Sequence, residues 1–143
     1  CQYIFTTANF LKYSPCIHSK VKTDKLYKET CVNDLQAGLE YMRESSSLDD
    51  WVNIACCAYN IWEDCFVNMT VANCGAGGAI AAYDLLDRGS GGLLHMKCNR
   101  IEFNANSDWC KSIIPLPGTK ATGRYSNSVF SKYFSFVCPN TGF

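Results

Sequence analysis

The sequence predicts an all-α protein, a disulfide-cross-linked helical bundle with an irregular, aromatic-rich carboxyl-terminal tail. Two observations favour this fold class. Apolar residues recur at steps of three and four along much of the chain, which is the period of an amphipathic helix. The 143 residues also include ten cysteines, and an even number of cysteines favours disulfide pairing. At this length we expect one domain that spans residues 1–143.

The first half of the chain contains three predicted helices. Residues 3–13 are expected to form a helix that stops at Ser14-Pro15, because the residue before a proline disfavours the helical conformation. Residues 23–43 carry leucines and a methionine at helical spacing. Residues 48–68 give the clearest pattern, and its apolar stripe comprises Trp51, Ile54, Ala55, Ala58, Ile61, Trp62 and Cys65.

The connection between the second and third helices is short and rich in serine. Ser47 and Asp50 predict a capping box, in which side chains bind the free backbone N–H groups at a helix start. A connection of this length predicts an antiparallel helical hairpin.

The second half of the chain has a weaker pattern. Glycines at 75, 77 and 78 precede a predicted helix through residues 80–86, and a Gly-Ser-Gly-Gly break at 89–92 separates it from an apolar pattern that resumes through 93–98. Residues 115–123 predict a turn-rich connection. The tail fits a short helix or a strand equally well, and its aromatic residues are Tyr125, Phe130, Tyr133, Phe134 and Phe136.

The spacing of the cysteines favours disulfides over metal ligands. No two are separated by two to four residues, and the only histidines are His18 and His95, so the close pairs of a structural zinc site are missing. We therefore expect no metal and up to five bridges, which form in an oxidising compartment. The cysteines are Cys1, Cys16, Cys31, Cys56, Cys57, Cys65, Cys74, Cys98, Cys110 and Cys138.

The adjacent cysteines Cys56 and Cys57 restrict the pairing. Neighbours on a helix point about 100° apart, so each should tie the 48–68 helix to a different element. The hairpin predicts a bridge from Cys31 to one of the two and from Cys98 to the other.

Three features predict a secreted, extracellular protein. The chain begins at Cys1 without methionine, which we interpret as a mature protein whose signal peptide is cleaved. No apolar run approaches the length of a membrane span. Asn68-Met69-Thr70 is an acceptor for N-glycosylation, and we predict a glycan on Asn68.

The segment that starts at Cys56-Cys57 resembles the calcium-binding secreted phospholipases A2, in which paired cysteines are followed by a His-Asp pair on a helix. In this chain Asn60 and Ile61 occupy those two positions. An amide is not a general base near neutral pH and isoleucine does not bind calcium, so we expect no catalytic residue of this kind.

No other constellation predicts an enzyme or a cofactor. If every sulfur is paired, no thiolate remains to act with His18 or His95 as a nucleophile. We expect His95 to be a satisfied surface or boundary residue, and Asp84 and Asp87 to lie on an exposed polar helix face. The formal net charge of zero argues against binding to nucleic acid.

Two further resemblances concern helical secreted proteins. The nine-residue steps between Cys56, Cys65 and Cys74 are similar to the spacing in insect odorant-binding proteins, which implies a carrier with an apolar cavity. This chain lacks that family's second cysteine beside Cys31. Aromatic tail residues would either line such a cavity or pack in the core, and they are Phe130, Phe134 and Phe136.

The segment from Cys65 through Cys74-Gly75 to a helix ending at Cys98 resembles uncharacterised secreted cysteine-rich helical proteins of arthropods and nematodes. We therefore expect a non-enzymatic extracellular interaction or structural module, with a protein partner or self-assembly into a larger assembly. The alternatives are a secreted carrier of a small apolar ligand or lipid, and a secreted toxin or effector.

Overall fold

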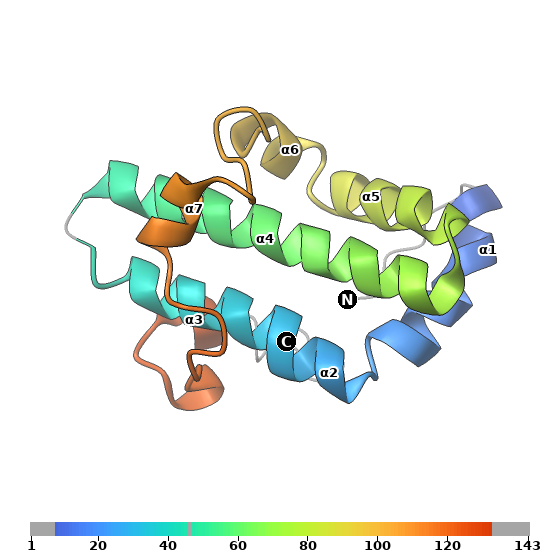
Figure 1. Cartoon of the computed structure of the whole chain (residues 1–143), viewed down its shortest axis with the longest axis horizontal. Coiled ribbons are helices and arrows are strands. Elements are labelled where there is room, and N and C mark those ends of the chain that lie inside the picture. The colour runs from blue at the N-terminus through green and yellow to red at the C-terminus, as the bar shows by residue number, and fades with distance from the viewer. Residues whose placement is uncertain (1–7, 46, 133–143) are drawn as a thin grey trace.

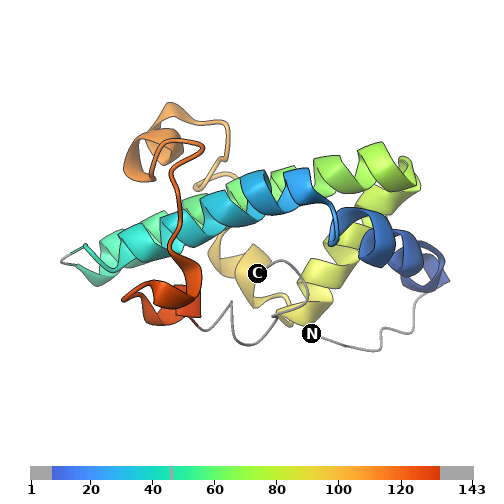
Figure 2. The same cartoon turned by 90° about the horizontal axis from the view of Figure 1, so that it is seen from below.

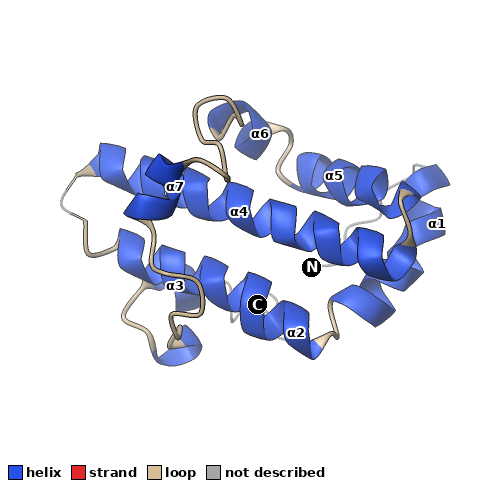
Figure 3. Ribbon diagram, viewed as in Figure 1, coloured by secondary structure: helices blue, strands red, loops and turns tan. Residues whose placement is uncertain are grey.

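The computed structural model describes residues 8–45 and 47–132, and within them the chain forms helices and loops without strands (Figure 3). The fold is therefore all-α and disulfide-cross-linked, as predicted. One long helix, α4 (Leu48–Cys74), runs through the middle of the molecule, and most of the other helices in the described residues pack along it (Figure 1).

The first helix does not stop at Ser14-Pro15. Helix α1 (Ala8–Cys16) includes Pro15 and continues into a π-helical turn, Ile17–Val21. Ile17 and Val21 are buried, and Cys16 is bonded to Cys74 at the far end of α4. The expectation was wrong because this burial and cross-link outweigh the local effect of proline, and the wider π turn lets the chain continue.

The helix predicted over residues 23–43 is present as one helical path with an irregular middle. It consists of α2 (Lys25–Tyr27), a π-helical turn (Lys28–Val32) and α3 (Asn33–Met42). Asp24 begins it by accepting a hydrogen bond from the Tyr27 backbone N at 2.9 Å.

Helix α4 begins where the sequence predicts. The Ser47 hydroxyl accepts a hydrogen bond from the Asp50 N at 3.1 Å, and Asp49 and Asp50 lie in the first turn, where the helix dipole favours negative charge. The predicted end at Asn68 was wrong, because the buried Thr70 and the bridged Cys74 extend the helix to Cys74. Gly75 ends it with a φ of 88°, which side chains rarely tolerate.

The remaining helices cover two parts of α4. Helix α5 (Gly77–Gly89) returns along its carboxyl half, and α6 (Leu93–Lys97) follows the predicted break (Figure 1). Helix α7 (Asp108–Ile113), which the sequence analysis did not predict, packs on the amino half.

The chain after α7 crosses to the α3 side, where Gly123–Tyr125 forms a 3-10 turn and residues 129–132 are helical (Figure 2). Tyr133, Phe134 and Phe136 lie outside the described residues, so the choice between helix and strand stays open there.

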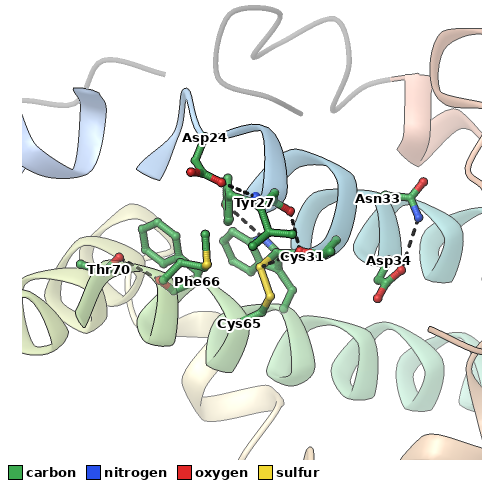
Figure 4. The surroundings of a disulfide bond; sticks show 12 residues. Asp24, Tyr27, Cys31, Asn33, Asp34, Cys65, Phe66 and Thr70 are labelled. Atoms are coloured by element: carbon green, nitrogen blue, oxygen red, sulfur yellow. Dashed lines mark hydrogen bonds between the residues drawn. A yellow bond between two sulfur atoms is a disulfide. The ribbon is translucent and has the colours of Figure 1, made fainter. Parts of the chain in front are cut away.

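An aromatic cluster joins the two arms of the helical hairpin. Trp62 and Phe66 stack with ring centroids 5.6 Å apart, and Tyr27 lies 5.9 Å from Phe66. The Trp62 Nε1 donates a hydrogen bond to the Tyr27 hydroxyl at 3.2 Å. Figure 4 shows Tyr27 and Phe66 beside the Cys31–Cys65 bridge, which fastens the same two arms covalently.

Four disulfides link the described part of the chain, and they are Cys16–Cys74, Cys31–Cys65, Cys56–Cys98 and Cys57–Cys110. As predicted, the adjacent pair Cys56 and Cys57 ties α4 to two different elements, and Cys98 binds one of them. Cys1 and Cys138 lie outside the described residues.

The predicted bridge from Cys31 to Cys56 or Cys57 was wrong. In an antiparallel hairpin, positions at similar distances along the chain from the connection lie opposite each other. Cys31 and Cys65 are nearly equidistant from Ser47, whereas Cys56 and Cys57 lie much closer to it. The register therefore pairs Cys31 with Cys65.

Candidate functional site

A groove of about 420 Å³ lies where the segment after α6 passes over the seam between α3 and α4. Its walls come from three parts of the chain that are distant in sequence: residues 31–37, residues 58–65 and residues 105–117. The lining is mostly apolar and includes Leu35, Ala58, Ile61, Trp62, Ala105, Ile114, Pro115, Leu116 and Pro117. The groove has the size of a site for a small organic molecule.

The charged groups that line the groove are not equivalent. The Asp34 Oδ1 accepts hydrogen bonds from the Gly118 N at 3.0 Å and from the Asn33 Nδ2 at 3.3 Å. The Asp64 Oδ1 lies 2.5 Å from the Arg100 Nη1. Lys111 on α7 is exposed and forms no ion pair with any residue in the described ranges. Both carboxylates at the groove thus have hydrogen-bond donors, although only Asp64 has a cationic partner, and Lys111 is the one cationic side chain of the lining.

The segment that directly follows the groove lining is held to α3 by polar side chains. The Asn33 side chain donates to the Thr119 O at 2.8 Å and accepts from the Ala121 N at 3.0 Å. Further along α3, the Glu40 carboxylate accepts hydrogen bonds from the Thr122 N at 3.1 Å and from the Gly123 N at 2.9 Å. These bonds fix residues 118–123 against the helix without burying much apolar surface.

A charged cluster lies on the other side of α4, centred on Glu63. This carboxylate has no exposed surface, and its two oxygens face the side chains of His95 and Arg100. Its Oε1 lies 2.5 Å from the His95 Nε2, and its Oε2 accepts a charge-assisted hydrogen bond from Arg100. The Tyr59 hydroxyl donates a longer bond to Oε1, at 3.4 Å.

His95 binds a second carboxylate with its other nitrogen. The Nδ1 lies 2.8 Å from the Asp87 Oδ1 on α5. Partial burial alone would lower the pKa of His95, but the hydrogen bonds to Glu63 and Asp87 favour the protonated ring and raise it above 6.5. Both nitrogens face carboxylates, so neither is free to take a proton from a substrate.

Burial also determines the protonation of Tyr59. Its removal from water raises its pKa, and the nearby charge of Glu63 raises it further. The phenol therefore stays protonated near neutral pH and serves as a hydrogen-bond donor to Glu63. Together these groups form a satisfied electrostatic cluster that links α4, α5 and α6.

The structure separates the other residues that the sequence analysis considered. Asn60, at the position of the phospholipase histidine, is fully buried, and its Nδ2 donates to the Cys98 O at 3.0 Å and the Phe103 O at 2.8 Å. His18 is exposed and lies apart from the charged cluster. Phe130 is exposed and does not line the groove, while Phe134 and Phe136 lie outside the described residues.

The exposed polar face expected for Asp84 and Asp87 is present in part. Asp84 forms an ion pair with Arg88 at 2.9 Å on the surface of α5. Asp87 is more than half exposed, but it also binds His95. His95 is a boundary residue, as expected, with 29% of its side chain exposed.

Neither the groove nor the role of Glu63 was predicted from the sequence. A signal for Glu63 was present, because Cys56, Asn60 and Glu63 follow one another at helical spacing and therefore share a buried face of α4. A charged residue on such a face requires a partner. No comparable signal exists for the groove, because its walls meet only in the folded chain.

The described residues define the class of protein as a small, all-helical, disulfide-cross-linked protein with an apolar groove beside α4. The chain matches no protein-family model, no curated protein and no solved structure. In residues 8–45 and 47–132, no helix is long and apolar enough to cross a membrane. The same residues contain no cluster of three side chains suited to hold a metal ion.

Proposed function

We propose that this chain is a secreted, non-enzymatic carrier that binds a small apolar molecule with an anionic end group. The observation that carries the proposal is the groove, whose volume of about 420 Å³ lies in the usual range for small-ligand sites. Its apolar lining supports an aliphatic or aromatic body for the ligand. The uncompensated Lys111 supports an anionic end, such as a carboxylate.

The number of disulfides supports the compartment. Four bridges in a chain of this size are typical of extracellular proteins, because thiols stay reduced in the cytosol. Asn68 lies on the exposed side of α4, which leaves room for a glycan. Mass spectrometry of the protein from its native source tests both features at once.

Calorimetric titration with decanoate and with uncharged 1-decanol tests the carrier function. We expect both probes to bind saturably with one site per chain, since both fill an apolar groove. The variant Lys111→Glu should weaken decanoate binding about tenfold and leave decanol binding nearly unchanged, because only the carboxylate interacts with the reversed charge.

Two controls locate the binding. Lys120→Glu makes the same charge change at an exposed lysine that does not line the groove, and it should leave both affinities unchanged. Leu116→Glu places a charge on an exposed groove residue and should weaken both probes. If neither probe binds the wild-type chain, the proposed carrier function is overturned. Equal effects of the two lysine variants would overturn the role of Lys111.

Self-assembly or a protein partner is a second candidate function. It is supported by apolar side chains that are strongly exposed near the end of α6, such as Met96 and Ile101. Light scattering that gives an obligate oligomer, together with failure of both probes to bind, would favour this interaction module over the carrier. A toxin or effector role has no comparable structural support.

A further inference from the structure

The segment from Gly91 to Cys98 is attached to the rest of the molecule in an unusual way. Helix α6 (Leu93–Lys97) has no buried residue, so apolar packing does not hold it in place. At one end it follows Gly91 and Gly92, both with positive φ. At the other end Cys98 is bonded to Cys56 on α4. The segment is therefore held at both ends, by the backbone hydrogen bond from the Gly92 N to the Asp87 O at 2.7 Å and by the bridge at Cys98, with little packing between them.

A single side chain connects the middle of this segment to the body. His95 lies 2.5 Å from Glu63 on α4 and 2.8 Å from Asp87 on α5. No other side chain of α6 forms a hydrogen bond or ion pair within the described residues. Between its two held ends, the position of α6 thus depends on the hydrogen bonds of one imidazole ring.

We propose that α6 is a pH-operated flap, which protonated His95 closes onto α4 and α5 and which moves away from them between Gly92 and the bridged Cys98 when His95 loses its proton. The protonated ring donates from both nitrogens, so it satisfies both carboxylates at once. The neutral ring has one donor and one lone pair. One of the two carboxylates then faces a lone pair, and that contact is repulsive.

The charged groups around His95 favour the closed flap when the ring is protonated. On α4 the groups that face His95 are the Glu63 carboxylate and the Tyr59 phenol, and on α5 the facing group is Asp87. From the loop after Cys98, Arg100 binds Glu63 and neutralises part of its charge. On α6 itself the only other charged side chain is the exposed Lys97.

The direction of the response follows from these partners. Hydrogen bonding to the two carboxylates raises the pKa of His95 in the folded protein above the value of 6.5 that it has when unfolded. The stabilising contacts are therefore complete below pH 6.5 and are lost as the pH rises through the folded-state pKa. The flap closes on acidification and opens at alkaline pH, and opening uncovers Glu63 and the Tyr59 ring.

Amide hydrogen exchange tests the flap. The protection of backbone amides in residues 93–97 should be measured at pH 5.5 and 8.5, with each rate corrected for intrinsic exchange at that pH. A peptide from the middle of α4 serves as the internal reference. In the wild type we expect protection of α6 to fall about tenfold at the higher pH, while the reference stays constant, because the loss of one hydrogen bond between a charged pair corresponds to a factor of about ten or more.

Three variants distinguish the flap from a general loss of structure. His95→Gln should give low protection of α6 at both pH values, and His18→Gln, at an exposed histidine, should behave as the wild type does. Asp87→Asn removes one acceptor charge at the surface and should reduce the pH response even if His95→Gln folds poorly.

Two results would overturn the proposal. The first is protection of α6 that does not change with pH in the wild type. The second is an unchanged pH response in Asp87→Asn or in a folded His95→Gln. Because α6 does not line the groove, these readouts do not depend on the proposed carrier function.

Discussion

Gly38 on α3 lies directly against Ala58 on α4, since a Cβ atom on Gly38 would sit 2.9 Å from the Ala58 Cβ. Both residues are buried. The two helices approach this closely because both side chains are minimal. Ala58 also lines the groove, so the contact between these residues sets the spacing of two groove walls.

We expect Gly38→Ala to destabilise the protein by about 1–3 kcal/mol, because the added methyl group overpacks a rigid contact. This cost should exceed the gain of about 1 kcal/mol that alanine brings to a helix interior. Urea unfolding with the disulfides intact measures the difference in free energy of unfolding.

Gly89 provides the matched control for this substitution. It is the last residue of α5, and a Cβ there would meet no atom within 4 Å. Gly89→Ala should be neutral or should stabilise the protein by up to about 1 kcal/mol. Equal stability of the two variants would contradict the close contact between α3 and α4.

The helices could be predicted because their signals are local. The apolar stripe of α4 and its cap at Ser47 can both be recognised from residues close together in the sequence, and both are present in the structure. The errors lie at helix ends whose positions are determined by contacts between residues distant in the sequence. Neither the passage of α1 through Pro15 nor the extension of α4 to Cys74 is predictable without the bridge that joins Cys16 to Cys74.

The candidate site was less predictable than the helices. Helix α7 is a short element whose local signals are the cap at Ser107 and the acidic Asp108. Its position over α4 depends on the bridge between Cys57 and Cys110, and ten cysteines allow many other pairings. The groove exists only where that bridge places residues 105–117. The amino-acid sequence of this segment therefore contains no pattern that predicts the groove.

The pairing of the cysteines is a direct prediction. Peptide mapping of the unreduced protein should give Cys31 joined to Cys65 and Cys57 joined to Cys110. A peptide that joins Cys31 to Cys56 or Cys57 would contradict the register of the hairpin.

Removal of one bridge tests its contribution to stability. The double variant Cys31→Ala with Cys65→Ala should lose about 2–4 kcal/mol of unfolding free energy, because the unfolded chain gains freedom. Urea unfolding of this variant and of the wild type gives the difference. A loss close to zero would mean that the aromatic cluster between the same two arms already holds them together.

Asn60 is expected to be essential for stability. Its buried amide donates to two backbone carbonyls, from Cys98 and Phe103, which hold the loop after α6 against α4. Asn60→Asp keeps the shape but puts a carboxylate oxygen where the amide donor was. We expect a loss of at least about 3 kcal/mol at pH 7, measured by thermal or urea unfolding.

The control for this substitution lies on the same helix. Asn68 is exposed, and Asn68→Asp should change stability by less than about 0.5 kcal/mol when both proteins are produced without glycans. A similar small effect at both positions would contradict the hydrogen bonds assigned to Asn60.

Glu40 should make the stability of the fold depend on pH in the acidic range. Partial burial alone would raise the pKa of Glu40, but hydrogen bonds from the Thr122 N, the Ser131 hydroxyl and the Gly123 N favour the carboxylate and lower its pKa below 4.5. The resulting stabilisation is therefore present above pH 4.5 and is lost as the pH falls through the folded-state pKa.

The variant Glu40→Gln should have a lower melting temperature than the wild type at pH 6, and the gap should narrow steadily as the pH is lowered from 4.5 to 3. The narrowing is expected because protonation of Glu40 in the wild type removes the same charge that the substitution removes. Glu44→Gln, at an exposed residue, should have the same melting temperature as the wild type over this range of pH. If the difference in melting temperature between Glu40→Gln and the wild type stays constant over this range, the Glu40 carboxylate does not fasten residues 122–131 to α3.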